Sequence, residues 1–182
     1  MKGKLRIGVI GAGRWSAAAH LPGFTRSPYS EVVAICDLDR DMAEARAQEF
    51  GIAEVMTDAD ELLARSDLDV VDIVTRGDHQ DLVFKALGAG KHVLVEKPVC
   101  HDYRDVVRAH RIAESKGLKT KVGLTFRYAP AVMYMFDLIR EGFIGRPFVF
   151  NGYEQNSQWL NPDNPMDKRV HKVKPEGEAP WG

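Results

Sequence analysis

Two glycines near the start of the chain predict a turn that binds phosphate groups. The apolar run 5–10 leads into Gly11-Ala12-Gly13-Arg14-Trp15-Ser16, and an alanine-rich helical stretch follows. Gly11 permits a tight turn, Gly13 lets the backbone approach a pyrophosphate, and the helix N-terminus supplies free N–H groups and a positive dipole. Ser16 stands where such a fingerprint has its third glycine, and it is small enough for helix-on-strand packing.

Strand, turn and helix come in the order that dinucleotide binding requires, so we favour this interpretation over a purely structural glycine turn. The cofactor contacts expected from the turn itself are Gly11, Ala12, Gly13, Arg14 and Trp15.

An acidic residue follows at the spacing of a ribose acceptor. Asp37 ends a second apolar run, about 20 residues after the turn. A carboxylate there can accept hydrogen bonds from both ribose hydroxyls and repels a 2′-phosphate, which favours NAD. Arg40 indicates the opposite preference, because a guanidinium binds a 2′-phosphate well, although an exposed place early in the next helix also accounts for it. NAD is the expected cofactor, with NADP as the alternative.

A charged pair, Glu96 and Lys97, follows the apolar segment 92–95 directly. In an open parallel sheet ligands bind beyond the carboxyl ends of the strands, so we expect Lys97 at the edge that holds the glycine turn. An ammonium group there can donate a hydrogen bond to a substrate hydroxyl or carbonyl, and can release a proton when partly removed from water. The alternative is that the two charges only mark a strand end. Pro98 fixes the following turn and permits a cis bond.

The elements that position these residues follow from the spacing of apolar side chains. Short β-branched runs without alternation are typical of strands buried on both faces, and they occupy 5–10, 31–36, 69–74, 91–95 and 119–124. Helical stretches lie between them, the clearest over 102–116. This alternation predicts an α/β fold, a Rossmann-type doubly wound parallel sheet over residues 1–123.

The pattern changes after residue 123, and we expect the incomplete start of a second α/β domain over 124–182. Pro130 suits the first turn of a helix that ends near Gly142, and the aromatic-rich segment 146–153 predicts a strand. From Asn151 onward apolar residues are sparse and prolines recur, so this tail cannot build a core by itself. We therefore expect the remainder of the domain to lie beyond these residues.

The composition excludes several classes of protein. The 182 residues are 45% hydrophobic and 28% charged, with a formal net charge of -1 at pH 7. This balance leaves no basic field to collect nucleic acid or anionic membrane, and no apolar run approaches the roughly 20 residues of a membrane span. Cys36 and Cys100 form neither a zinc nor a disulfide motif, and we expect no signal peptide at the N-terminus. We expect a cytoplasmic protein with no metal, nucleic acid or membrane partner.

Several motifs occur in a fixed order along the chain: the glycine turn, His20-x-Pro22, Thr75 with His79, Glu96-Lys97-Pro98, Phe126-Arg127-Tyr128-Ala129-Pro130 and Glu141-Gly142-x-x-Gly145. Together they resemble the glucose-fructose oxidoreductase, inositol dehydrogenase and rhizopine-catabolism (Gfo/Idh/MocA) family over residues 4–153. The resemblance implies a dinucleotide-dependent oxidoreductase acting on sugars, cyclitols or related polyols. It also implies a Rossmann domain followed by an open-sheet α/β domain.

The resemblance assigns roles to individual residues. Lys97 would lie near the nicotinamide and position or deprotonate the reacting hydroxyl, with Glu96 and Pro98 shaping the site. Arg127 and Tyr128 would lie near the nicotinamide and substrate. The cofactor contacts that it adds are Thr75, His79, Glu96, Lys97 and Arg127.

Two departures from the family pattern stand out. Arg76 follows Thr75 where the family usually has proline. The family also places an Asp and a His, four residues apart, on a second-domain helix announced by paired glycines. Asp167 and His171 have that spacing without the glycines, so we expect no role for them.

The function expected of the complete protein is hydride transfer between NAD and a sugar, cyclitol or polyol hydroxyl. Lys97 is the expected catalytic residue, and a homo-oligomer is the expected assembly. Without the family's Asp and His, the 182 residues are expected to bind NAD but to turn over poorly or not at all. The alternative is a non-catalytic module that senses the dinucleotide, against which the presence of Lys97 argues.

Overall fold

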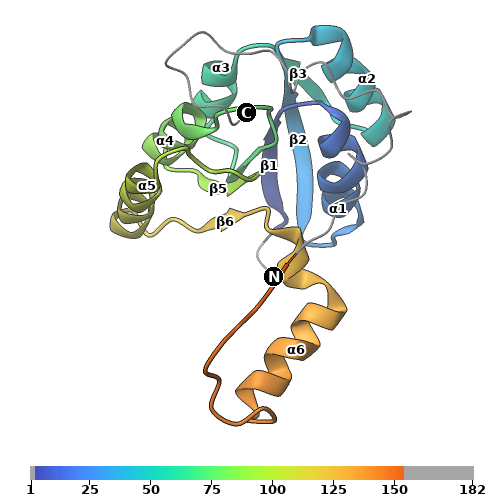
Figure 1. Ribbon diagram of the computed structural model, residues 1–182. Helices are drawn as coiled ribbons and strands as arrows, with labels where there is room; N and C mark the ends of the chain where they lie inside the picture. Colours follow the sequence, from blue (N-terminus) through green and yellow to red (C-terminus); the bar gives the residue numbers. More distant parts are fainter. Residues whose placement is uncertain (1–2, 154–182) are drawn as a thin grey trace, which may run out of the picture. The chain divides into compact units, whose positions relative to one another are not determined.

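The computed structural model describes residues 3–153 (Figure 1). The chain divides into two compact units, the first Met1–Leu124 and the second beginning at Thr125. The sequence placed this boundary between residues 123 and 124. The substrate and dimerisation role assigned to residues 124–182 stays a prediction.

The first unit is built on a six-stranded parallel sheet in the order β3-β2-β1-β4-β5-β6. The chain runs from β1 outward to β3 and then returns to β4 on the other side of β1, so the strand order reverses between β1 and β4. This order confirms the predicted Rossmann-type sheet. The strands are β1 (Leu5–Ile10), β2 (Ser30–Cys36), β3 (Glu54–Met56), β4 (Val70–Ile73), β5 (His92–Val95) and β6 (Thr120–Val122).

Helices cover both faces of this sheet, which is why its central strands are mostly apolar (Figure 1). Helices α1 (Leu21–Arg26) and α2 (Arg40–Phe50) bury one cluster of apolar side chains against one face. Helices α3 (Ala59–Ala64), α4 (Gln80–Gly88) and α5 (Tyr103–Ser115) bury a larger cluster against the other. Asp39, Asp58 and Asp102 cap α2, α3 and α5, each side chain accepting a hydrogen bond from an N–H of the first turn.

Backbone hydrogen bonds continue past the strands at the carboxyl edge of the sheet. The N–H groups of Gly11, Val74, Glu96 and Gly123 each donate to the last carbonyl of a neighbouring strand, at 2.8–2.9 Å. Each of the four is the first residue beyond its own strand. The segments that leave β1, β4, β5 and β6 are therefore in register along one edge.

The second unit contains a short 3₁₀ helix, η2 (Thr125–Tyr128), and α6 (Pro130–Arg140). Pro130 opens α6 as predicted, and Gly142 follows its end with a φ of +80°.

One predicted strand is absent, and one strand of the sheet was not predicted. The predicted strand over 146–153 is wrong: these residues form no strand, and Phe148 and Phe150 are exposed. The described part of the second unit offers no neighbouring strand to pair with their N–H and C=O groups. Strand β3, a three-residue strand with no buried side chain at the edge of the sheet, was not predicted. Asp167 and His171 lie outside the described residues, and none of the helices within 3–153 has the length and apolar character of a membrane span.

Candidate active site

The glycine turn lies where the strand order reverses. Gly11 has a φ of +111°, and a Cβ atom there would stand 2.7 Å from the Val74 carbonyl carbon, just beyond β4. Gly11 is therefore required by the close approach of two backbones as well as by its own conformation. A Cβ at Gly13, by contrast, would have no atom within 4 Å. The turn thus leaves open space at the glycine that the sequence assigns to pyrophosphate contact.

Asp37 is attached to the same turn. One carboxylate oxygen accepts a hydrogen bond from the Ala12 N–H at 2.7 Å, and the other accepts from the Asp39 N–H at 3.0 Å. These bonds fix the carboxylate beside the glycines, at the end of β2. Arg40 instead pairs with Glu44 on the exposed side of α2, at 2.9 Å.

Further groups of this region suit a dinucleotide. The buried hydroxyls of Ser16 and Thr75 have no hydrogen-bond partner within the described protein, one after the glycine turn and one after β4. Arg46 of α2, which sequence analysis missed, donates from Nε to the Ala12 carbonyl at 3.4 Å, while its Nη1 pairs with Glu49 at 2.6 Å. Arg14 is exposed at the start of the helical segment. Backbone donors, unpaired hydroxyls and a cation are the groups that bind a pyrophosphate.

Lys97 emerges from the same edge of the sheet, after β5. Its side chain is exposed, its peptide bond to Pro98 is cis, and its own N–H donates to the Glu96 carboxylate at 3.2 Å. The other Glu96 oxygen accepts a hydrogen bond from the Trp15 indole N–H at 3.1 Å. The side chain of Trp15, at the glycine turn, therefore contacts Glu96, the residue before Lys97.

His20 and Asp72 extend the contact between Trp15 and Glu96 into the interior of the sheet. His20 ends the π-helical turn η1 (Ser16–His20), which links the glycine turn to α1. Its Nδ1 lies 2.9 Å from Asp72 of β4, and its Nε2 lies 3.2 Å from Glu96. The side chains of His20, Asp72 and Glu96 are 8%, 0% and 9% exposed.

The pKa of His20 is raised although its side chain is buried. Burial acts to lower the pKa of His20, but the hydrogen bonds and charges of Asp72 and Glu96 outweigh it and raise the pKa. Burial raises the pKa of Asp72 against the opposing effect of His20. Sequence analysis noted His20 only as part of a motif and overlooked Asp72, although an acidic residue inside an apolar strand is a recognisable signal.

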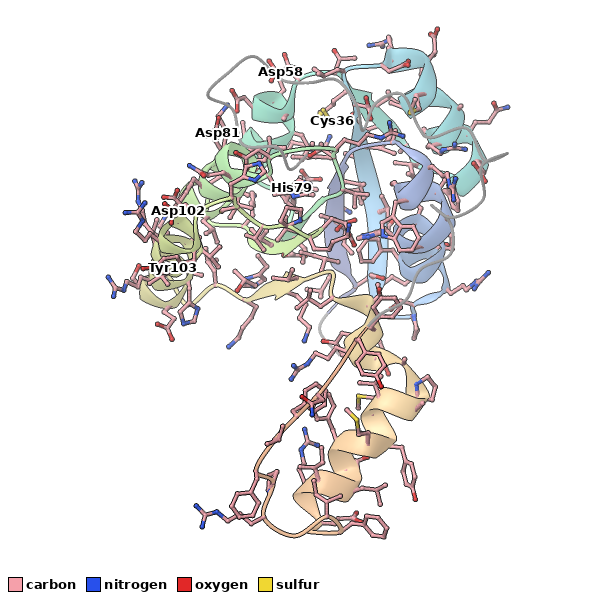
Figure 2. All side chains as sticks on the ribbon, in the orientation of Figure 1. Cys36, Asp58, His79, Asp81, Asp102 and Tyr103 are labelled. Atoms are coloured by element: carbon pink, nitrogen blue, oxygen red, sulfur yellow. The ribbon has the colours of Figure 1, made fainter. Side chains whose placement is uncertain are left out.

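His79 lies inside the first unit (Figure 2) and is 2% exposed. Its ring nitrogens lie 2.9 Å from the Thr75 carbonyl and 2.7 Å from the Pro98 carbonyl. The ring therefore joins the loop after β4 to the loop after Lys97, and a contact with the cofactor would require one of these bonds to be given up. Arg127 lies exposed in η2 of the second unit, so its contact with the cofactor stays a prediction.

The comparison with known families agrees with this geometry. Residues 5–124 match the family model described as "Oxidoreductase family, NAD-binding Rossmann fold", the Gfo/Idh/MocA model. The chain belongs to the Gfo/Idh/MocA family. This confirms the family predicted from the motifs and the prediction of an NAD-binding Rossmann domain.

Individual relatives include enzymes of sugar and cyclitol metabolism. The chain is 31% identical over 180 residues to an inositol 2-dehydrogenase/D-chiro-inositol 3-dehydrogenase of Lacticaseibacillus casei, covering 93% of this chain and 51% of that protein. It is 37% identical over 142 residues to a dTDP-3,4-didehydro-2,6-dideoxy-alpha-D-glucose 3-reductase of Streptomyces violaceoruber, covering 78% and 41%. The chain thus spans about half, or less, of the length of these curated relatives.

Among the solved structures of relatives, one contains NAD(H) and another contains NADP. The scyllo-inositol dehydrogenase of Lactobacillus casei, with bound NAD(H) and scyllo-inositol, matches with a TM-score of 0.72 at 28% identity, over 78% of this chain and 42% of that one. A 3-ketoreductase of Actinomadura kijaniata in complex with NADP matches with a TM-score of 0.71 at 33% identity, over 79% and 46%.

Proposed function

We propose that this chain is the dinucleotide-binding part of an NAD-dependent dehydrogenase or reductase of sugars, cyclitols or related polyols, with Lys97 as its catalytic residue. The observation that carries this proposal is the shared edge of the sheet. The glycine turn after β1, Asp37 after β2 and Lys97 after β5 all leave the carboxyl ends of parallel strands. The substrates in the names of the relatives support the substrate class.

Each part of the edge has a chemical task in this proposal. The backbone N–H groups around Gly13 bind the pyrophosphate, and Asp37 accepts hydrogen bonds from the ribose hydroxyls. The bound nicotinamide supplies the hydride acceptor or donor. Oxidation of a CH–OH group also releases the hydroxyl proton, and we assign the amine of Lys97 to receive it, or to return it in the reverse direction.

The preference for NAD rests on Asp37. Its carboxylate is fixed beside the turn by the Ala12 and Asp39 N–H groups and would repel a 2′-phosphate. Arg40, the residue that would favour NADP, is paired with Glu44.

We further propose that these 182 residues bind the dinucleotide but turn over poorly. The chain spans about half, or less, of the length of these relatives. Its sequence contains no Asp and His pair preceded by the family's paired glycines. Removing a general acid–base group typically costs about 10²–10⁴-fold in rate.

The experiment is a calorimetric titration of the chain with NAD and NADP, followed by turnover assays of a form extended to the relatives' length. Lys97→Ala is compared with Lys85→Ala, which removes an exposed lysine of α4 that pairs with Asp60 of α3. We expect Lys97→Ala to keep dinucleotide affinity within about threefold and to lose at least about 100-fold in turnover, while Lys85→Ala keeps both. A Lys97→Ala protein with normal turnover contradicts the catalytic assignment. Tight dinucleotide binding by an extended form that never oxidises or reduces a polyol favours the sensor alternative.

A further inference from the structure

A chain of polar side chains crosses the interior of the first unit. Asp72 is a wholly buried carboxylate in β4, a strand whose other members are valine and isoleucine. Both of its oxygens lie within 3.1 Å of His20 Nδ1, and His20 Nε2 faces Glu96 at 3.2 Å. Glu96 also accepts from the Trp15 indole and from the Lys97 N–H. Nothing in the proposed reaction uses Asp72 or His20.

We propose that His20 and Asp72 are positioning residues: Asp72 holds His20, and His20 holds the Glu96 carboxylate, so that the turn carrying Lys97 keeps a fixed place relative to the glycine turn. This inference rests on the proposed function only for its catalytic consequence.

The arrangement is a chain and not a metal-binding set. The two carboxylates contact opposite nitrogens of one ring, so they cannot converge with that ring on a single ion. Consistent with this, residues 3–153 contain no cluster of three His, Cys, Asp or Glu side chains suited to a metal. An imidazolium donates from both nitrogens, whereas a neutral ring donates from only one. When Asp72 and Glu96 are both ionised, each therefore receives a hydrogen bond from the ring only while His20 carries its proton.

Glu96 has little freedom to move without breaking this chain. A Cβ atom at Gly123 would lie 2.2 Å from one Glu96 oxygen and 2.9 Å from its carboxyl carbon, so the backbone after β6 closes one side of the carboxylate. Trp15 and His20 hold the same oxygen from the η1 side, and the Lys97 N–H holds the other. Loss of the hydrogen bond between His20 and Glu96 therefore displaces Glu96, the residue before Lys97, and with it Trp15.

Protonation of His20 offers a direct test. Among residues 3–153, the titratable groups that face the ring are Asp72 of β4 and Glu96 after β5, and their hydrogen bonds and charges raise the pKa of His20 despite its burial. A nearby carboxylate shifts a titration by roughly 1–3 pH units, so removal of one charge is expected to lower the His20 midpoint by about 1 pH unit or more.

The experiment uses the 182-residue chain labelled with ¹⁵N. The ring nitrogens of His20 and the indole N–H of Trp15 are followed by NMR against pH, with resonances assigned by His20→Gln and Trp15→Phe. We expect His20 to keep its proton to a higher pH in the native chain than in the urea-denatured chain, and the Trp15 resonance to titrate with His20. In Asp72→Asn the His20 midpoint falls by about 1 pH unit or more, and the Trp15 resonance moves although Trp15 does not contact Asp72.

Asp69→Asn is the matched control, because Asp69 precedes β4 and is exposed. It should change neither resonance. If His20 titrates at the same pH in the native and the urea-denatured chain, or if Asp72→Asn leaves His20 and Trp15 unchanged, the positioning role is overturned. Should Asp72→Asn fail to fold, His20→Gln supplies the second test: a Trp15 resonance that stays in place refutes the connection.

The failure of this inference is distinguishable from failure of the proposed function. The NMR measurements need no cofactor, so they stand even if the chain binds no dinucleotide. In an active extended form, Asp72→Asn should lower kcat by about tenfold or more with KM for NAD within about threefold, and should shift the pH profile. An unchanged kcat and pH profile would contradict the catalytic consequence while leaving Lys97 as the catalytic residue.

Discussion

Replacing each glycine of the turn, Gly11 and Gly13, by alanine should separate folding from binding. In Gly11→Ala the new Cβ atom would stand 2.7 Å and 2.8 Å from the Val74 carbonyl carbon and oxygen and 2.9 Å from the Thr75 nitrogen. These separations are at least about 0.5 Å shorter than ordinary carbon contacts of ~3.5 Å, and backbone atoms cannot rotate away as a flexible side chain can. The alanine would also hold a φ near +111°, which L-residues rarely adopt.

The destabilisation follows from these contacts. A strained backbone conformation costs about 1–3 kcal/mol. Opening the contact also weakens the hydrogen bonds from Gly11 to the Cys36 carbonyl and from Val74 to the Ile10 carbonyl, each 2.8 Å long and each contributing about 0.5–1.5 kcal/mol. We expect Gly11→Ala to lower the free energy of unfolding by about 2–4 kcal/mol, which for a domain of this size lowers Tm by roughly 8–15 °C.

Gly13→Ala is the matched variant. Its Cβ meets no atom within 4 Å and its φ is not positive, so the free energy of unfolding should stay within about 1 kcal/mol of the native value. The methyl group nevertheless occupies space that we assign to the pyrophosphate, so NAD affinity should fall about tenfold or more. Thermal unfolding followed by circular dichroism measures the first effect, and calorimetric titration with NAD measures the second. Equal unfolding temperatures for the two variants, or native NAD affinity in Gly13→Ala, would refute the reasoning.

Three further predictions concern the edge of the sheet and the start of α5. Asp37→Ser should weaken NAD binding by roughly tenfold or more and raise the affinity for NADP relative to NAD, whereas Asp41→Asn should change neither in the same titrations. Burial, with the charge of Asp37 second, raises the pKa of the Cys36 thiol to about 11 from 9.0, so iodoacetamide at pH 8 should label it at least about 100-fold more slowly in the native than in the denatured chain. The Arg104 guanidinium, and then its backbone N–H, lower the pKa of Asp102, so its capping of α5 is stabilising above the unfolded value near pH 4 and is lost as the pH falls below it. Asp102→Ala should therefore lower Tm at pH 7 and have a smaller effect near pH 2.

Much of the Rossmann unit was predictable because its strands are buried on both faces. Such strands are continuous apolar runs, and the predicted run over 5–10 coincides with β1. Predicted ends differ by one or two residues elsewhere, as at β6, because the hydrogen bonds that end a strand depend on its neighbours. The predicted strand over 146–153 failed for the same reason: aromatic residues favour strands, but pairing requires a partner strand that the pattern of one segment cannot supply.

Part of the candidate site could likewise be predicted from the sequence, and part could not. The sequence by itself determined the glycine turn, Asp37 and Lys97, because each is a residue type that follows directly on a strand, and parallel topology then brings all strand ends to one edge. Only the tertiary structure decided which side chains join them. Trp15 and His20 come from the helical segment after the glycine turn, Asp72 from β4 and Glu96 from just beyond β5. Their contacts depend on how far β1, β4 and β5 lie apart and how that helical segment packs. Spacing along a chain fixes the order of such groups, whereas hydrogen bonds of about 3 Å are fixed only by the packing of the folded sheet.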